Sequence, residues 1–245
     1  METLKPSSIT LDFLEKLFRN KSKVSLDIAL KDKVEKAAKI VEDAARGNSP
    51  VYGVNTGFGK LANKIIPHED REKLQKNLVL SHCSGVGEPL QEDVTRLMMI
   101  LKIISLSFGA SGVKWSTINQ IEKIVNSDIV PEIPHQGSVG ASGDLAPLAH
   151  MAAVMIGEGW AYYKGEKVTG GEALKKAKID PIILGPKEGL ALLNGTQFST
   201  VVPFESIDKL IGIIIKPDIK ITTKEYQFFE SIGQGYNIAY WKLND

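Results

Sequence analysis

The spacing of hydrophobic residues predicts a mainly helical chain. In the stretches 25–46, 89–108 and 116–126, apolar residues recur every three or four positions, as in a helix that buries one face. The first stretch stops at a glycine, and Pro89 suits the first turn of the second helix. Residues 145–156 are apolar nearly all round, so we expect this helix to lie in the interior.

The segments between these helices are of two kinds. WAYYKGEKV, residues 160–168, predicts a small hairpin with its turn near Lys164 and Gly165. Residues 51–60 and 131–143 are rich in glycine and predict irregular loops.

The end of the chain differs in composition from the rest. From residue 201 on there are nine isoleucines and seven of the chain's 17 aromatic residues, but a single alanine, Ala239. The helices predicted upstream are rich in alanine and leucine. We therefore expect two parts, residues 1–200 and a divergent tail, 201–245.

Composition excludes several classes of protein. The 245 residues include 30 basic and 29 acidic ones, a net charge of +1, which gives no electrostatic basis for nucleic acid as the main partner. Cys83 is the single cysteine, so no disulfide can form within the chain. The N-terminus lacks the apolar run of a secretory signal, and no apolar stretch is long enough to span a bilayer. We expect a cytoplasmic protein.

Three common site patterns fail in this sequence. GASGD around Ser142 lacks the last glycine of the G-x-S-x-G elbow, which leaves a serine hydrolase as a weak alternative. A phosphate-binding loop ending at Lys60 would need glycine where Val54 stands. The four histidines show no metal-ligand spacing, so we expect no metal site.

The tripeptide Ala141-Ser142-Gly143 can supply chemistry that unmodified side chains lack, namely an electrophile. In a tight bend, the amide nitrogen of Gly143 can attack the carbonyl carbon of Ala141. Loss of two waters, one of them carrying the Ser142 hydroxyl, leaves a five-membered ring with an exposed methylidene group. Alanine leaves its carbonyl open to approach, and glycine gives the bend its backbone freedom.

The residue after the tripeptide, Asp144, stands where the N-cap of the next helix belongs. A helix N-terminus beside the ring would favour its electrophilic character. For Ala-Ser-Gly-Asp alone, a flexible turn capped by this aspartate is the simpler interpretation.

The wider stretch resembles the signature of the aromatic amino acid ammonia-lyase family, without a break from Gly137 to Ala149. Three further segments resemble motifs of that family, in order and with plausible spacing: YGVNTGFGKLAN from Tyr52, LVLSHCSGVGEPL from Leu78 and EGLALLNGTQ from Glu188. The resemblance covers about residues 8–200, the N-terminal half of such a lyase. It implies the fumarase/aspartase-like helical fold of the family, with a small hairpin added.

The resemblance also implies a role for each matching residue. Ala141, Ser142 and Gly143 would form the 4-methylideneimidazol-5-one group (MIO), and no external cofactor is needed. Tyr52 matches the base that removes the β-hydrogen of the substrate, and Asn194 matches an asparagine that bonds near the ring and the substrate.

The pair Ser81-His82 matches the substrate-selecting pair of members that act on histidine. Because a histidine can hydrogen-bond an imidazole, we expect L-histidine to be converted to urocanate and ammonia. Phenylalanine or tyrosine as the substrate is the alternative, since other members carry an apolar residue in this pair.

Family members are roughly twice as long as this chain and form homotetramers whose active sites combine three subunits. The resemblance therefore implies a homo-oligomer. The alternative to an active lyase is a truncated, non-catalytic remnant or a subunit that packs with a fuller lyase.

Overall fold

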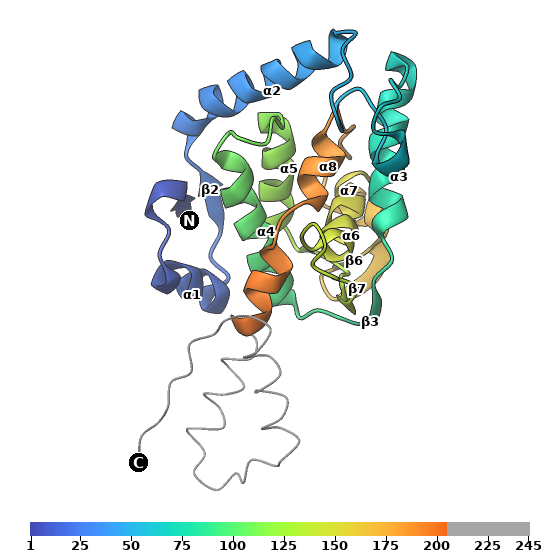
Figure 1. Cartoon of the computed structure of the whole chain (residues 1–245). Coiled ribbons are helices and arrows are strands. Elements are labelled where there is room, and N and C mark those ends of the chain that lie inside the picture. Colours follow the sequence, from blue (N-terminus) through green and yellow to red (C-terminus); the bar gives the residue numbers. More distant parts are fainter. Residues whose placement is uncertain (205–245) are drawn as a thin grey trace, which may run out of the picture. The chain divides into compact units, whose positions relative to one another are not determined.

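The computed structural model describes residues 1–204, and Met1–Val202 form one compact unit. The predicted tail therefore lies almost wholly outside the described residues. The predicted mainly helical fold is confirmed (Figure 1). The α-helices are α1 (Leu11–Asn20), α2 (Lys31–Arg46), α3 (Arg71–His82), α4 (Glu92–Ser107), α5 (Trp115–Val125), α6 (Leu145–Met155), α7 (Gly170–Lys176) and α8 (Glu188–Leu193). Residues 197–204 are also helical. Single 3-10 turns are η1 (Pro6–Ser8), η2 (Ile28–Leu30), η3 (Gly59–Leu61) and η4 (His68–Asp70).

Short strands form three small sheets in the described part. The strands are β1 (Glu2–Leu4), β2 (Val24–Leu26), β3 (Val86–Pro89), β4 (Ile129–Pro131), β5 (Pro134–Gln136), β6 (Trp160–Tyr163) and β7 (Glu166–Thr169). β1 pairs with β2 in parallel, β3 pairs with β5 antiparallel, and β6 lies between β4 and β7 with both neighbours antiparallel.

The predicted hairpin is confirmed as β6 and β7. Its turn residues, Lys164 and Gly165, have φ angles of 53° and 84°. Positive φ at both central positions is typical of the two-residue turn that matches the twist of the flanking strands.

Two predicted helix starts are wrong. The helix predicted from residue 25 begins at Lys31, because Val24–Leu26 pairs with β1 and the Leu26 amide donates to Glu122 on α5. The helix predicted from Pro89 begins at Glu92, because Pro89 ends β3 and pairs with Pro134. In both cases pairing with a distant segment overrides a local signal that favours helix.

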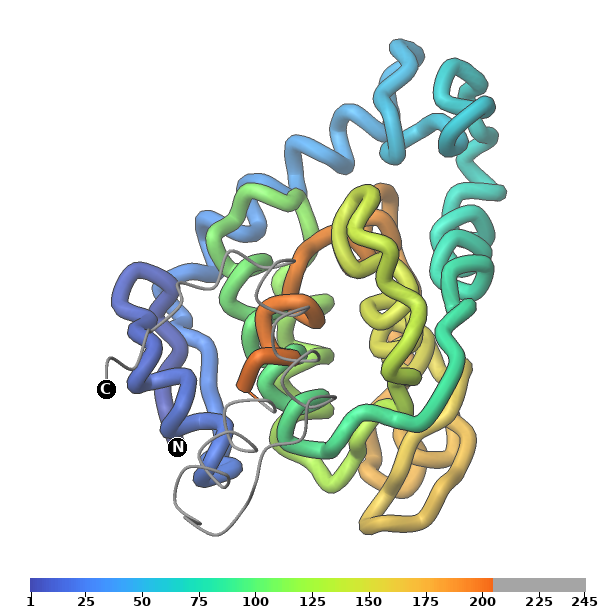
Figure 2. The backbone as a smooth tube through the Cα atoms, turned by 60° about the horizontal axis from the view of Figure 1, so that its bottom comes forward, coloured from blue at the N-terminus to red at the C-terminus, as the bar shows by residue number. Residues whose placement is uncertain are grey.

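The core lies around α4 and α6. Every residue from Ala146 to Met155 except His150 is buried, which confirms the predicted interior helix. In Figures 1 and 2, α4, α5, α6 and α8 lie in the middle of the unit, α1 and α3 lie on opposite sides, and α2 crosses one end. Both α3 and α8 contact α6, and they contact each other. This packing places α3, α6 and α8 against one another.

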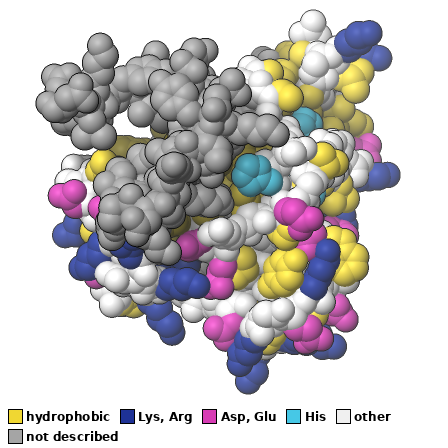
Figure 3. All heavy atoms as spheres, turned by 90° about the horizontal axis from the view of Figure 1, so that it is seen from below, with side chains coloured by type: hydrophobic (Ala, Val, Ile, Leu, Met, Phe, Trp, Pro, Cys, Tyr) yellow, Lys and Arg dark blue, Asp and Glu magenta, His cyan; other side chains and the backbone are white. Residues whose placement is uncertain are grey.

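The surface of the described unit carries both signs of charge. On the face shown in Figure 3, lysine and arginine side chains alternate with aspartate and glutamate, and hydrophobic side chains lie between them. Within residues 1–204, none of the helices combines the length and the apolar character needed to cross a membrane.

Candidate active site

The predicted tripeptide lies against the loop that follows α8. Gly143 and Gly195 form an isolated parallel bridge, and the Asp144 amide donates to the Gly195 carbonyl at 2.7 Å. Gly143 has a φ of +97°, and a Cβ atom there would lie 2.4 Å from that carbonyl oxygen. Only glycine fits this approach, because any side chain would collide with backbone atoms.

The other two residues of the tripeptide are accessible. Ala141 and Ser142 are both exposed. The Ser142 hydroxyl donates to Asn194 Oδ1 over 3.5 Å, at the long limit of a hydrogen bond. Both residues are therefore accessible from solvent, and the Ser142 hydroxyl lies beside Asn194.

The Asp144 side chain does not cap α6, contrary to the sequence-based interpretation. Asp144 occupies the N-cap position, but its buried carboxylate accepts from Ser138 Oγ at 2.6 Å, Ser199 Oγ at 2.5 Å and the Ser199 amide at 2.8 Å. Ser199 lies in the first turn of the helical segment 197–204. The carboxylate thus satisfies an amide at the start of that later helix, where negative charge is favourable, and joins it to the tripeptide.

The backbone carbonyl of Asn194 is hydrogen-bonded to a buried lysine of α4. Lys102 is 1% exposed, and its Nζ donates to the Asn194 carbonyl at 2.6 Å. Burial lowers the pKa of Lys102 to about 7. The Asn194 amide donates to the Leu190 carbonyl within α8, so both the backbone amide and the backbone carbonyl of Asn194 are hydrogen-bonded.

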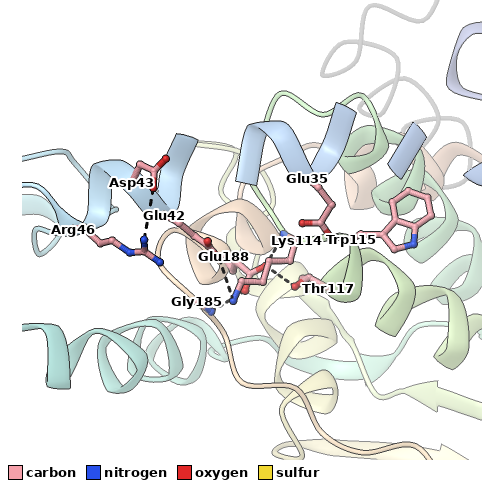
Figure 4. Close-up of polar contacts among 9 residues, drawn as sticks. All are labelled: Glu35, Glu42, Asp43, Arg46, Lys114, Trp115, Thr117, Gly185 and Glu188. Carbon is pink, nitrogen blue, oxygen red and sulfur yellow. Dashed lines mark hydrogen bonds and ion pairs between the residues drawn. The ribbon is translucent and has the colours of Figure 1, made fainter. Parts of the chain in front are cut away.

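A buried carboxylate positions the other end of α8. Glu188 is 2% exposed and accepts from the Lys114 amide at 2.9 Å, from Thr117 Oγ1 and from the Gly185 amide at 2.7 Å (Figure 4). Lys114 and Thr117 form the start of α5. The short helix that leads to Asn194 is therefore tied to the core at both ends.

Tyr52 lies on the predicted irregular loop, with 54% of its surface exposed. Its ring meets Phe58 edge to face, with ring centroids 5.8 Å apart. The next residue, Gly53, lies directly on α8, because a Cβ there would be 2.7 Å from Leu190 Cδ2. Buried Asn55 fixes the loop by accepting from the Val51 amide and donating to backbone carbonyls.

His82 ends α3 and is half-buried. Its Nδ1 lies 2.8 Å from the Leu78 carbonyl and 3.2 Å from Ser81 Oγ. A carbonyl only accepts, so Nδ1 carries the proton and Nε2 is the acceptor of the neutral ring. The neighbouring Cys83 is a neutral thiol, because burial raises its pKa to about 11.

The segment after His82 is tied to α6. The Gly85 amide donates to His150 Nε2 at 3.1 Å, and burial lowers the pKa of His150 against the opposing effect of Glu132. This contact places β3 beside β5, which leads into the tripeptide loop.

The structure brings some predicted site residues together and leaves others apart. Ser142 bonds to Asn194, and Gly143 pairs with the next residue, Gly195. Tyr52 and His82 lie on elements that contact α8 or α6, but within residues 1–204 neither side chain bonds to the tripeptide. No cluster of three or more potential metal-ligating side chains occurs in that part of the chain.

Sequence reasoning missed the groups that support the site. Lys102 bonds to a backbone carbonyl 92 positions away, and Glu188 bonds to the Lys114 amide and the Thr117 hydroxyl on α5 as well as to the nearby Gly185 amide. A charged residue in an otherwise apolar helical stretch, as at Lys102, was the one available signal.

Known proteins resemble nearly all of the described unit. The sequence profile of the family described as "Aromatic amino acid lyase" matches residues 9–213. Histidine ammonia-lyase of Bradyrhizobium diazoefficiens is 54% identical over 204 residues, which are 83% of this chain and 39% of that protein. The chain spans about two-fifths of the length of this relative.

Solved structures of similar enzymes also align with most of this chain. Histidine ammonia-lyase of Trypanosoma cruzi aligns with a TM-score of 0.77 at 35% identity, over 84% of this chain and 41% of that one. Phenylalanine aminomutase of Pantoea agglomerans aligns with a TM-score of 0.79 at 34% identity, over 86% and 41%.

Proposed function

The chain belongs to the aromatic amino acid lyase family, and from that premise we propose that it is the electrophile-bearing part of a histidine ammonia-lyase. The reaction would remove ammonia from L-histidine and release urocanate. The 54% identity to a histidine ammonia-lyase supports this choice within the family.

The observation that carries the proposal is the approach of Gly143 to Gly195. Residues 141–143 fit the MIO group, because the bend at Gly143 admits no Cβ and because Ala141 and Ser142 remain accessible. Once formed, the group would supply an electrophile that makes the amine of the substrate a leaving group. Asn194 is placed to bond the Ser142 hydroxyl before it leaves as water.

The other matching residues would act on the substrate. With Nδ1 donating to the Leu78 carbonyl, the neutral form of His82 offers Nε2 as an acceptor, and the N–H of a substrate imidazole is a matching donor. A phenyl ring has no such donor and would leave Nε2 without a partner, which disfavours phenylalanine. Exposed Tyr52 would take the β-hydrogen at its phenol oxygen.

A remnant or packing subunit is the second candidate, because the chain covers 39% of its histidine ammonia-lyase relative. The proposed active form is a cytoplasmic homo-oligomer, a tetramer as in the family. Light scattering of the purified chain tests its assembly.

Intact mass distinguishes the two candidates. Ring formation removes two waters and lowers the mass by about 36 Da. A chain with this deficit that also releases urocanate, detected by its ultraviolet absorbance, supports the lyase. An unmodified mass supports the remnant.

His82→Leu tests the substrate. The variant should lose activity on L-histidine by about a hundredfold or more while its mass deficit is kept. Turnover of phenylalanine or tyrosine by the unaltered chain would overturn the assignment to histidine.

A further inference from the structure

We propose that Lys102 is a positioning residue whose amine anchors the Asn194 carbonyl and so fixes the loop against which the 141–143 tripeptide bends. The effect on ring formation rests on the proposed function, whereas the anchoring does not.

The bond from Lys102 is one of three hydrogen bonds made by the backbone of Asn194 and Gly195. The Asn194 amide bonds back to α8, the Asn194 carbonyl accepts from Lys102, and the Gly195 carbonyl accepts from Asp144. The first bond comes from the helix that carries the loop, and the third comes from the tripeptide side. Lys102 is the contact that ties the loop to the buried helix α4, 92 residues away in the chain.

The position of the peptide group between Asn194 and Gly195 matters because Gly143 approaches Gly195 so closely. The Asn194 carbonyl and the Gly195 nitrogen share one planar peptide unit. Without the Lys102 bond, the two dihedral angles that flank that unit, ψ of Asn194 and φ of Gly195, could change, which would displace the Gly195 carbonyl from the Asp144 amide and redirect the Asn194 side chain. Both changes would free Gly143 from the bend and separate Asn194 from Ser142.

A lysine at this place is costly for stability. The neighbouring buried residues of α4 include Met98, Met99 and Ile103, all apolar. Within residues 1–204 no carboxylate pairs with Lys102, and burial alone lowers its pKa to about 7. An unpaired amine in such surroundings destabilises a fold relative to an apolar side chain of similar size. The donor that the lysine supplies offsets this cost, since both the amine and the ammonium carry N–H groups.

The test uses the full 245-residue chain and the variant Lys102→Met, which is unbranched like lysine and one atom shorter, and has no donor. Hydrogen exchange of the peptide that contains the Asp144 amide reports the anchor. Intact mass reports ring formation. Lys102→Met should be as stable as the unaltered chain or more stable, and yet the Asp144 amide should exchange about tenfold faster, the loss expected for one strong hydrogen bond. Its cyclised fraction should fall by about the same factor.

Three matched variants complete the design. Lys123→Met removes an exposed lysine and should change none of the readouts. Lys102→Arg keeps N–H donors and should recover most of the protection. Leu97→Ala destabilises the same helix at a buried apolar position and should leave exchange at Asp144 unchanged below the unfolding transition.

Each outcome decides the proposal. Unchanged exchange at Asp144 in Lys102→Met overturns it, and so does an equal increase in Leu97→Ala. If Lys102→Met is less stable than the unaltered chain, the exchange rate at Asp144 is compared with that of an equally destabilised Leu97→Ala. A larger increase in Lys102→Met still supports the proposal. If the unaltered chain shows no mass deficit, the proposed function fails and the exchange rates alone decide the role of Lys102.

Discussion

Glu188→Gln tests whether the buried carboxylate fixes α8 to the core. The glutamine amide oxygen can keep the Lys114 and Thr117 donors, but its NH2 group then faces the Gly185 N–H at the position of Oε2. The NH2 group and the Gly185 N–H are both donors, and they face each other at a residue that is 2% exposed. The negative charge that strengthened the bonds from Lys114 and Thr117 is also lost.

The expected loss of unfolding free energy is about 3 kcal/mol, from one unsatisfied buried donor and two weakened bonds. For a unit of about 200 residues this lowers the melting temperature by about 6–12 °C. Urea denaturation followed by circular dichroism measures the free energy, and a thermal scan measures the shift.

Glu42→Gln is the matched control. Glu42 contacts Lys114 Nζ at 3.7 Å, and both side chains are partly exposed, so this change should cost less than about 1 kcal/mol. Equal losses in the two variants would refute the view that the Glu188 contacts (Figure 4) secure the helix.

Three further predictions follow from the site. Gly143→Ala should abolish the mass deficit of about 36 Da, because its φ of +97° and the Gly195 carbonyl exclude a side chain; a full deficit in this variant would contradict the proposed bend. Cys83 should react slowly with iodoacetamide at pH 8 and faster as the pH approaches 11, because its raised pKa keeps the thiol neutral; a rate already at its plateau at pH 8 would exclude this. Lys102→Met should have a larger unfolding free energy than the unaltered chain at pH 7. This difference in unfolding free energy should narrow by about 1 kcal/mol per pH unit between pH 7 and 9, because in this range Lys102 is protonated in the unfolded chain and has lost its proton in the folded one. Denaturation midpoints that differ by the same amount at every pH would show that the amine does not titrate in this range.

The sequence predicted elements whose signals are local. The nearly unbroken apolar character of residues 145–156 predicted α6, and Lys164-Gly165 predicted the turn of the hairpin. Residues 25 and 26 were predicted as the start of a helix, because nothing in the segment itself shows that β1 pairs with it. α3 was not predicted as a helix, because its buried positions include polar Gln75 and its apolar period is weak.

The candidate site divides in the same way. Residues with a chemical signature, such as Ser142 and Asn194, were found from motifs, and the structure brings these two together. The Asp144 side chain was misassigned because its true partner, Ser199, lies 55 positions away. Supporting groups bond mostly to backbone amides and carbonyls, which every residue carries, so a charge in an apolar stretch, as at Lys102, was the one sign of them.

The contact between Gly143 and Gly195 also sets an order of events during synthesis. Ser142 and Asn194 are 52 positions apart, so the ribosome completes the tripeptide long before it makes the loop that bends it. The proposed electrophile would consequently be absent while the nascent chain is still unfolded and exposed to cellular amines and thiols. The electrophile would form only after the chain has folded.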